Sequence, residues 1–559
     1  MAKKSQKIKP KPKKKTEPEN KTKLTPAENK KQKKIDSMSF EDKLWETAEL
    51  LIGAVSPSEY KNIALGLMFV KFISDRYEER RKEIEKETNN PKSEIYCKTE
   101  EKRKYWLNLK DQYSSKGIFY LKEGDRWSDL KKIISTEKNL GIKIDAMLDQ
   151  IEKDNSSLAG VLPKVFSGAP IPNDNLQQLV ELFDSITTHD HSKDAFGRIY
   201  EYFMRNFSKK LGEKGGEFFT PESIVRLLVE ILEPYQGIVY DPTCGSGGMF
   251  VQSYKFLKAH KDENQNTKQG ISIYGIEKKN EVLRICKMNL AIRGIESKNI
   301  VLGDCFLDHP HSKLKANRVL ANPPFNLREW GYDKLKEDAR FQKYGIPTPS
   351  KAGGNYAFME HMLYHLDEKD GRMGIVLANG SMASGGTEGK IRQNMIEDDI
   401  LDCMIALPTN LFFTVTIPAC LWFFTKNKDD GKTRKRKGET LFIDARKIFT
   451  KIDRVLNELS EEQIEQIAGT YRSYIGEKGH PKYKDIPGYC KVATRDEIAK
   501  NNYVLTPGRY VGAEDIEDDD EPFEEKMKRL TTEYAKLSEE SAKLDKEIRK
   551  NLKEIGFEI

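Results

Sequence analysis

The stretch Val319-Leu320-Ala321-Asn322-Pro323-Pro324-Phe325 joins a short apolar run to a polar, proline-rich end. The apolar run predicts a buried strand, and the residues from Asn322 to Phe325 would then form the loop at the carboxyl end of that strand. In open α/β sheets, ligands bind at the carboxyl ends of the strands. This loop is therefore a candidate binding site.

The residue types in this loop suit the binding of a planar amino group. The Asn322 carboxamide offers one acceptor and the Pro323 carbonyl a second, while neither proline has an N–H that needs a partner. Two acceptors on the two amine hydrogens would draw the lone pair out of ring conjugation and leave it nucleophilic. Phe325 could stack on a base taken out of a duplex. A proline pair after a strand can also simply end strand pairing, so the loop alone leaves both interpretations open.

Short apolar runs alternate with helical stretches on both sides of this loop. Such alternation is typical of a parallel sheet with crossover helices, so we expect an α/β fold. The candidate strands are Ile238–Tyr240, Ile271–Ile276, Ile300–Leu302, Arg318–Ala321, Met373–Ala378, Leu401–Ala406, Cys420–Thr425 and Leu441–Ile443.

A second candidate site lies at the ends of the first three strands. The strand ending at Asp241 runs into Pro-Thr-Cys-Gly-Ser-Gly-Gly, residues 242–248, whose glycines would let the backbone approach a nucleoside-bearing cofactor. Glu277 ends the next strand, where an acid would reach ribose hydroxyls, and Asp304 follows the third, where it could accept from an adenine amino group. Each acid alone could be an ordinary helix cap. Their repetition at successive strand ends favours a cofactor site.

A glycine-rich segment, Gly-Glu-Lys-Gly-Gly-Glu-Phe-Phe-Thr-Pro at 212–221, precedes the first strand. We expect Thr220 and Pro221 to be the cap and first residue of a helix through Leu232. His361 and His365 are four residues apart on a predicted helix, but no third ligand is evident. We therefore expect a packed or exposed helix face there and no metal site.

The charge is unevenly distributed along the chain. The net charge is +7, but residues 1–36 hold 14 lysines against 4 acidic residues, so the remainder sums to −3. Non-specific DNA affinity comes mostly from Lys and Arg, so the body should bind DNA through local patches or through a partner. The lysine-rich tail has too few apolar residues to order itself, and is either a solubilising extension or a nucleic-acid arm.

The composition also limits the compartment. No apolar run approaches the roughly 18 residues of a membrane span, and the amino terminus lacks the apolar segment of a secretory signal. The seven cysteines are scattered without Cys-x-x-Cys spacing, which predicts reduced thiols without disulfides or a zinc site. We expect a cytoplasmic protein.

Two helical regions flank the predicted sheet. Ser56-Pro57-Ser58-Glu59 is a capping box that should begin a helix with Tyr60, Ile63, Leu67 and Val70 on one face. At the other end, apolar residues keep an approximate heptad spacing, which predicts either a helix that docks on another chain or one folded back on its own body. This stripe comprises Phe523, Met527, Leu530, Tyr534, Leu537, Ser541, Leu544, Ile548 and Leu552. The predicted divisions are a disordered tail at 1–36, an α-helical domain at 37–210, a catalytic domain at 211–450, a mixed helical region at 451–512, and an acidic linker with the docking helix at 513–559.

Three motifs occur in the order Glu217-Phe-Phe-Thr-Pro, Asp241-Pro-Thr-Cys-Gly-Ser-Gly-Gly and Asn322-Pro-Pro-Phe. In this order the chain resembles the gamma-type amino methyltransferases that make N6-methyladenine in DNA, and specifically the methylation (M) subunit of type I restriction-modification systems. The helical amino-terminal domain, the Tyr-Glu-Tyr-Phe helix at 200–203 and the long carboxyl-terminal helix are similar to that subunit too. The resemblance covers roughly residues 38–555. Asn-Pro-Pro-Phe alone also resembles enzymes that methylate protein glutamine or RNA adenine.

The resemblance implies a Rossmann-like sheet that uses S-adenosylmethionine as methyl donor. It also implies double-stranded DNA as substrate, a specificity (S) subunit shared by two M subunits, and a restriction (R) subunit, with no membrane. A non-catalytic scaffold of the same fold is the rival interpretation. One small departure is Asn317-Arg318 before the fourth strand, where an acidic residue is more usual. The implied catalytic residues are Asn322, Pro323, Pro324 and Phe325; those that contact the cofactor are Glu217, Phe218, Phe219, Thr220, Pro221, Glu222, Asp241, Gly245, Ser246, Gly247, Gly248, Glu277 and Asp304; and those that stack on the target base are Phe325, Phe412 and Phe413.

Overall fold

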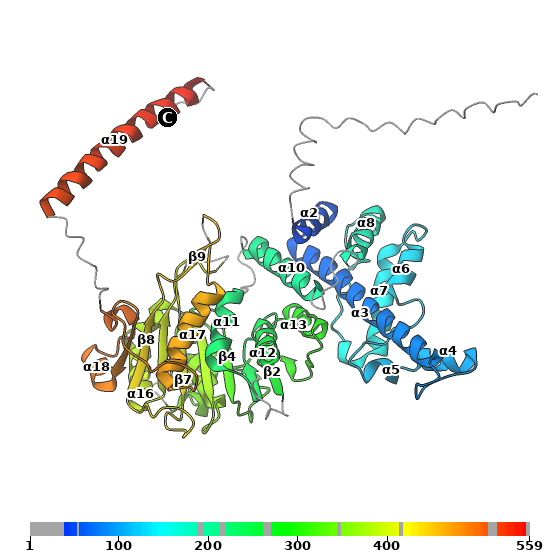
Figure 1. Ribbon diagram of the computed structural model, residues 1–559, viewed down its shortest axis with the longest axis horizontal. Coiled ribbons are helices and arrows are strands. Elements are labelled where there is room, and N and C mark those ends of the chain that lie inside the picture. The colour runs from blue at the N-terminus through cyan, green and yellow to red at the C-terminus, as the bar shows by residue number, and fades with distance from the viewer. Residues whose placement is uncertain are drawn as a thin grey trace, which may run out of the picture. The chain divides into compact units, whose positions relative to one another are not determined.

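The computed structural model describes two compact units, Met1–Glu217 with Lys287–Ile295, and Phe218–Cys286 with Glu296–Ile559 (Figure 1). The lysine-rich tail lies outside the described residues. The structure describes residues 39–52, 55–186, 195–212, 220–260, 270–343, 348–412, 417–454, 456–512 and 523–554.

The first unit is built from helices. Its longest helix begins as the capping box predicted, because the Ser56 side chain accepts from the Glu59 N–H and the Glu59 carboxylate accepts from the Ser56 N–H at 3.1 Å. Tyr60, Ile63 and Leu67 are buried on this helix, which confirms the predicted apolar face. The helices are α2 (Phe40–Ile52), α3 (Pro57–Asn89), α4 (Glu100–Asn108), α5 (Asp111–Ser114), α6 (Trp127–Ile133), α7 (Leu140–Asp154), η1 (Ser156–Leu158), α8 (Asn173–Asp184) and α10 (Ala195–Gly212).

Aromatic rings join α2, α3 and α10 in the core of this unit. The Trp45 ring meets those of Tyr60 and Phe207 edge-on, with ring centroids 5.6 and 4.9 Å apart. Phe203 adds another edge contact to Trp45 at 5.3 Å. Such offset pairs add to the burial of large apolar area, so the helical periodicity read from the sequence corresponds to a packed core.

The second unit contains a nine-stranded sheet in the order β11-β8-β6-β7-β5-β4-β1-β2-β3. All eight candidate strands are present and the sheet is mostly parallel, but β7 runs antiparallel to β5 and β6, and β11 antiparallel to β8. Periodicity marks a strand without giving its direction, which is why these reversals were not predicted. The strands are β1 (Gly237–Asp241), β2 (Ile271–Glu277), β3 (Ile300–Leu302), β4 (Arg318–Ala321), β5 (Arg372–Ala378), β6 (Leu401–Ala406), β7 (Ala419–Thr425), β8 (Glu439–Asp444) and β11 (Cys490–Thr494).

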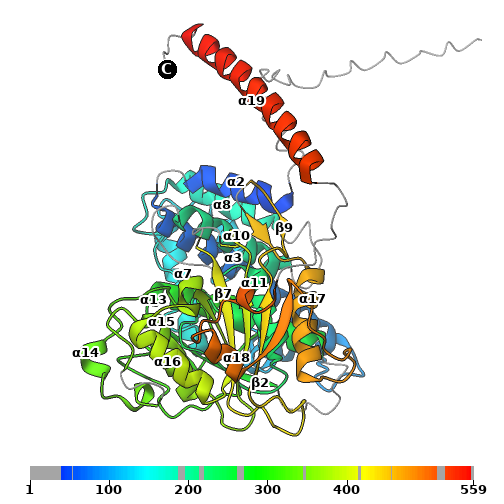
Figure 2. The same ribbon diagram turned by 90° about the vertical axis from the view of Figure 1, so that its left-hand side faces the viewer.

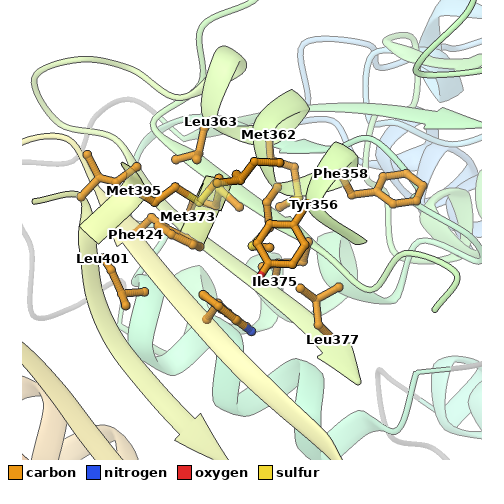
Figure 3. Close-up of a cluster of buried hydrophobic side chains, with 14 of the residues drawn as sticks. Tyr356, Phe358, Met362, Leu363, Met373, Ile375, Leu377, Met395, Leu401 and Phe424 are labelled. Carbon is orange, nitrogen blue, oxygen red and sulfur yellow. The ribbon is translucent and has the colours of Figure 1, made fainter. Parts of the chain in front are cut away.

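Helices cover both faces of this sheet. Figure 2 shows α15 and α16 on one face and α17 on the other. On β5 the two faces alternate: Met373 and Ile375 lie in the buried cluster with α15 (Figure 3), while a Cβ on Gly374 would lie 2.8 Å from Leu228 of α11. The helices of this unit are α11 (Glu222–Leu232), α12 (Gly248–Ala259), α13 (Asn280–Ile292), α14 (Tyr332–Leu335), η2 (Ala339–Phe341), α15 (Gly354–His365), η3 (Asn379–Met382), α16 (Gly386–Glu397), α17 (Glu461–Ile475), α18 (Arg495–Lys500), η4 (Pro507–Arg509) and α19 (Phe523–Glu554).

The unusual Asn317-Arg318 pair has a structural role. The Asn317 Oδ1 accepts the Ile238 N–H at 2.9 Å, and the Arg318 guanidinium donates to the carbonyls of Leu232 and Asp370. The pair therefore ties the start of β4 to β1 and to the end of α11. None of the described helices has the length and apolar character needed to cross a bilayer.

The chain continues to contribute to the sheet after residue 450. A short hairpin of β9 (Thr450–Lys451) and β10 (Asn457–Glu458) follows β8, then α17 and β11 return to the same unit. Residues 451–512, predicted to be a mixed helical region, thus supply an edge strand as well as helices. The long carboxyl-terminal helix is present as α19.

Glu360 on α15 has a carboxyl group whose surroundings disfavour its charge. The side chain is fully buried, and neither oxygen has a hydrogen-bond partner among the described residues. Burial raises its pKa to about 9, whereas an unfolded glutamate titrates near a pKa of about 4.3. Because the folded pKa is the higher one, the free energy of unfolding should fall as the pH rises from about 5 to 9.

We predict that Glu360→Met stabilises the protein at alkaline pH. The substitution removes an unpartnered buried carboxyl at similar volume, so the free energy of unfolding should rise by about 2 kcal/mol at pH 8 and by less at pH 5. Urea unfolding followed by tryptophan fluorescence at both pH values measures this. Glu329→Met, at an exposed position, is the control. An equal effect at the two pH values would contradict the assigned pKa.

Candidate functional site

The loop after β4 places Asn322 against Thr220. The Asn322 Nδ2 donates to the Thr220 Oγ1 at 2.8 Å, while the Asn322 Oδ1 is buried and accepts no hydrogen bond from the described residues. An unsatisfied buried acceptor costs about 1–3 kcal/mol, so its presence indicates a position where a ligand donates. This oxygen is the acceptor that the sequence predicted for an amino group.

Thr220 has a different role from the predicted one. The helix α11 begins at Glu222, with Pro221 at the cap position and no side-chain cap. The expectation that Thr220 caps this helix was therefore wrong, and its hydroxyl accepts from Asn322 instead. A hydrogen bond between residues 102 positions apart leaves no signal in local sequence. Glu217, Phe218 and Phe219 lie outside the described residues.

The rest of the Asn-Pro-Pro-Phe loop leads to an aromatic pair. Pro323 is buried, Pro324 is exposed and Phe325 is half-buried. The Phe325 ring meets that of Phe412 edge-on, with centroids 5.9 Å apart and an interplanar angle of 80°. Two of the three aromatic residues expected at the target base thus lie together. The third, Phe413, is outside the described part of the chain.

Asn355, at the start of α15, holds the backbone that follows Phe325. Asn326 has a left-handed φ of 55°; its N–H donates to the Asn355 Oδ1 at 2.9 Å, and the Asn355 Nδ2 donates back to the Asn326 Oδ1 at 2.9 Å. Beside this pair, a Cβ on Gly354 would lie 2.4 Å from the Leu327 carbonyl oxygen. Sequence reasoning missed this contact, although the Gly353-Gly354-Asn355 run before an apolar helix was a signal that could have revealed it.

The predicted cofactor motif forms one side of a pocket that also reaches Asn322. Gly245 and Gly247 have left-handed φ values of 53° and 82°, a conformation that glycine adopts without strain. They form the turn that leads into the N-terminus of α12, where backbone N–H groups favour polar or anionic ligands. Six of the expected site residues line this pocket: Thr220, Asp241, Gly245, Ser246, Gly248 and Asn322.

A buried carboxyl, that of Asp241, and a half-buried one, that of Glu277, lie behind the glycine turn. The Asp241 Oδ1 accepts the Thr243 N–H at 2.9 Å, and burial raises the pKa of this carboxyl to about 7. The Glu277 carboxylate accepts from the Gly245 N–H at 3.1 Å and the Lys279 N–H at 2.8 Å. Burial also raises the Glu277 pKa. Glu277, which was expected to contact the cofactor beside the glycine turn, therefore also fixes the backbone of that turn.

The other two expected acids that the structure describes, Asp304 and Glu222, are bound by neighbouring residues. Burial alone would raise the Asp304 pKa, but the Lys278 ammonium at 2.8 Å and the N–H groups of Phe306 and Leu307 hold it below its usual value. Asp304 thus closes the turn after β3, and it is not a helix cap because the described residues that directly follow it form no helix. Glu222 accepts from Gln252 and Lys255 of α12 at 2.8 and 3.3 Å. For both, contact with a cofactor stays a prediction.

His309, which is half-buried, joins the buried His361 and His365 in a cluster that the sequence did not reveal. One ring nitrogen from each lies within 4.8 Å of the others, a spacing that could suit a metal. However, the Arg340 guanidinium donates to the His361 Nδ1 at 3.1 Å, and the His361 Nε2 meets the Tyr240 hydroxyl at 3.0 Å. Desolvation and Arg340 lower the pKa of these imidazoles, to about 4 for His309 and about 3 for His365. A neighbouring guanidinium opposes a second cation, so we infer a neutral hydrogen-bonded cluster.

The sequence matches the N-6 DNA Methylase family over residues 191–519 and the HsdM N-terminal domain over residues 40–183. The chain belongs to the N-6 DNA methylase family. This confirms the family that the order of the three motifs predicted.

Individual relatives agree with this assignment over most of the chain. The type I restriction enzyme MjaIX methylase subunit of Methanocaldococcus jannaschii is 38% identical over 93% of this chain and 92% of its own length. The HindI methylase subunit of Haemophilus influenzae is 43% identical over 74% of this chain and 92% of its own length. The crystal structure of a type I restriction-modification methyltransferase subunit from Streptococcus thermophilus superposes with a TM-score of 0.71, at 25% identity, covering 85% of this chain and 99% of that one.

We predict that Asn355→Ala slows methyl transfer in this methylase. Because the substitution releases the backbone after Phe325, kcat should fall by up to about 100-fold, the cost of misplacing reacting groups by an ångström. Binding of S-adenosylmethionine, measured by calorimetry, should change little, since Asn355 is not among the residues that line the pocket.

Asn326→Gly is the matched control. Glycine keeps the left-handed backbone and its N–H, so only the Asn355 Nδ2 bond to the Asn326 side chain is lost. A smaller loss of kcat is expected. A wild-type kcat in Asn355→Ala would show that this pair does not position the loop.

Proposed function

We propose that this chain transfers the sulfonium methyl of S-adenosylmethionine to N6 of an adenine rotated out of duplex DNA, as the modification subunit of a type I restriction-modification complex. The observation that carries the proposal is the buried Asn322 Oδ1, which has no partner among the described residues, beside the glycine-lined pocket. An acceptor at this position suits an amine donor, and the pocket suits the methyl donor.

The residues of the β4 loop would act by positioning. Asn322 Oδ1 and the Pro323 carbonyl would accept the two hydrogens of N6, so that its lone pair turns towards the methyl group. Phe325, with Phe412 beside it and Phe413, would hold the ring of the flipped base. S-adenosylmethionine, when bound, supplies an electrophilic methyl, so no strong base is needed. N6 would gain the methyl as the methyl–sulfur bond breaks, the sulfur would leave as the neutral thioether S-adenosylhomocysteine, and N6 would release one proton to water.

The cofactor would occupy the pocket between α11 and the glycine turn. Glu277 would accept from ribose hydroxyls, while Asp241 and residues Gly245–Gly248 would surround the amino-acid portion. Because Glu277 accepts best when ionised and burial raises its pKa, binding should strengthen as the pH rises through that pKa. The remaining proposed contacts to the cofactor are made by Glu217, Phe218, Phe219, Thr220, Pro221, Glu222 and Asp304.

Asn322→Ala is expected to abolish methyl transfer while leaving S-adenosylmethionine binding largely intact. The reason is that the substitution removes the acceptor but leaves the glycine turn unchanged. Transfer of radiolabelled methyl to DNA and calorimetry of the cofactor measure the two effects. Asn501→Ala, at the residue that follows α18, is the control and should keep both activities. Retained turnover by Asn322→Ala would exclude the proposed mechanism.

The substrate class needs its own experiment. The purified chain, with and without the specificity subunit, is offered unmethylated DNA, and N6-methyladenine positions are then sequenced. Methylation at one sequence supports the proposal. Methylation of RNA adenine or protein glutamine but not DNA would favour those alternatives, and a failure to bind S-adenosylmethionine would favour a scaffold.

The proposed partners are duplex DNA, a specificity subunit shared by two copies of this chain, and a restriction subunit. The exposed stripe of α19 supports a protein partner, because apolar side chains at heptad spacing are exposed on it: Met527 43%, Tyr534 75%, Leu537 58%, Leu544 53% and Ile548 52%. A continuous apolar stripe of this kind marks an interaction surface. With chromosomal DNA as substrate, we propose a cytoplasmic location.

Leu537→Glu combined with Leu544→Glu should prevent assembly with the specificity subunit. Two carboxylates in an apolar seam would lose their hydration, at a cost of several kcal/mol. Size-exclusion chromatography of the mixed subunits measures assembly. Ala535→Glu with Ala542→Glu adds the same charges beside the stripe and should leave assembly unchanged. Assembly of the leucine variant would show that α19 docks elsewhere.

A further inference from the structure

The β9–β10 hairpin leaves the sheet at the carboxyl end of β8, on the same side as the Asn-Pro-Pro-Phe loop at the carboxyl end of β4. Strand β5 is parallel to β4, β7 is antiparallel to both β5 and β6, and β8 is parallel to β6. The carboxyl ends of β4 and β8 therefore point the same way. Because the hairpin follows Asp444 at the end of β8, it leaves the sheet on the side where the target base is proposed to bind.

Hydrogen bonds connect β10, the second strand of this hairpin, to the loop that carries Phe412. The Asn457 N–H donates to the Asn410 carbonyl at 2.8 Å, and the Asn457 Nδ2 donates to the Thr409 carbonyl at 2.9 Å. Phe412 follows two residues after Asn410 and contacts Phe325. The hairpin is thus fixed to the aromatic wall of the site rather than being an independent protrusion.

The β9 side of the hairpin combines cationic and apolar side chains. Residues 449–454 are all exposed, with Phe449 39% and Ile452 53% accessible, and β9 projects from the body of its unit (Figure 1). Residues 446–458 hold four basic and two acidic side chains. Within the described part of the chain, neither Lys451 nor Arg454 forms an ion pair or a side-chain hydrogen bond.

This surface is a local cationic patch, which a body without excess positive charge needs in order to bind DNA. The chain outside residues 1–36 sums to −3, so its affinity for a polyanion depends on where cations gather. Four inter-strand steps separate β8 from β4, or about 19 Å. At about 3.4 Å per base pair, that distance corresponds to about six base pairs along a duplex.

We propose that the β9–β10 hairpin binds duplex DNA within about six base pairs of the flipped adenine. Lys451 and Arg454 pair with backbone phosphates, and Phe449 and Ile452 pack against the sugars or base edges between them. Apolar side chains flanked by cations are the chemistry with which proteins hold deformed DNA. The inference rests on the proposed function, to which it adds a DNA contact made by this chain rather than by the specificity subunit.

The test compares two charge-removing variants of the full chain, each assembled with the specificity subunit. The probe is a 30-base-pair duplex carrying the sequence that the methylation experiment identifies. Lys451→Gln with Arg454→Gln should weaken binding and reduce the slope of log Kd against log salt by about 1.8, because each lost phosphate contact contributes about 0.9.

Lys478→Gln with Lys500→Gln is the matched control. Both lysines are exposed and lie near the opposite edge of the sheet, because Arg434 of the β7–β8 connection bonds to Ile475 and Thr494 pairs with Glu439. This control should keep the wild-type slope. Phe449→Ala with Ile452→Ala should weaken binding without changing the slope, since no charge is removed.

Three results would overturn the proposal. If the Lys451/Arg454 variant keeps the slope of the control, the hairpin does not contact phosphates. If it fails to assemble with the specificity subunit, the hairpin is a protein-docking element instead. If the wild-type complex methylates no DNA, the proposed function itself fails, and this is visible before any variant is made.

Discussion

The hydrogen bond from Asn322 Nδ2 to Thr220 Oγ1, 2.8 Å long, is the interaction on which the site depends. It connects the loop after β4 with the backbone that leads into α11, so the amine-binding and cofactor-binding halves share one contact. In this arrangement Nδ2 is bound to Thr220, and the acceptor left without a partner among the described residues is Oδ1, the atom that an amine donor requires. The hydrogen bond therefore holds the carboxamide in the orientation in which this oxygen remains available.

This orientation is useful only because the surrounding framework is rigid. On one side, α15 packs through Tyr356, Met362 and Leu363 into the buried cluster of Figure 3, and its first turn holds Asn326 through Asn355. On the other side, the Glu277 carboxylate fixes the Gly245 N–H. Groups that are held before the substrate arrives lose little freedom during the reaction. The packed core of the sheet thus contributes directly to the geometry of the site.

The sequence predicted those features that leave a local pattern. Strands such as Ile271–Ile276 and the capping box at Ser56 were identifiable because apolar period and turn chemistry are properties of neighbouring residues. The reversed direction of β7, the edge strand β11 and the third histidine of the cluster could not be predicted, because they depend on pairing across the fold. Thr220 shows the same limit: its residue type fits a helix cap, and a partner 102 residues away decided otherwise. The candidate site was predicted as a set of residues, whereas the contact between Asn326 and Asn355, which lie 29 positions apart, was missed although the glycines before Asn355 hinted at a close approach.

The distribution of charge and apolar surface suggests how the proposed chemistry and the choice of target are separated. Apart from the lysine tail the chain has a net charge of −3, so long-range attraction to DNA contributes little and non-specific residence on DNA should be short. A few cations on a hairpin tied to the catalytic loop would act only once a duplex is already aligned. Alignment would come through the exposed stripe of α19, which offers apolar rather than charged contacts to a partner. A catalytic body with weak DNA affinity of its own would have an advantage, because methyl transfer would then occur at the sites that the partner binds rather than wherever the local concentration of DNA is high.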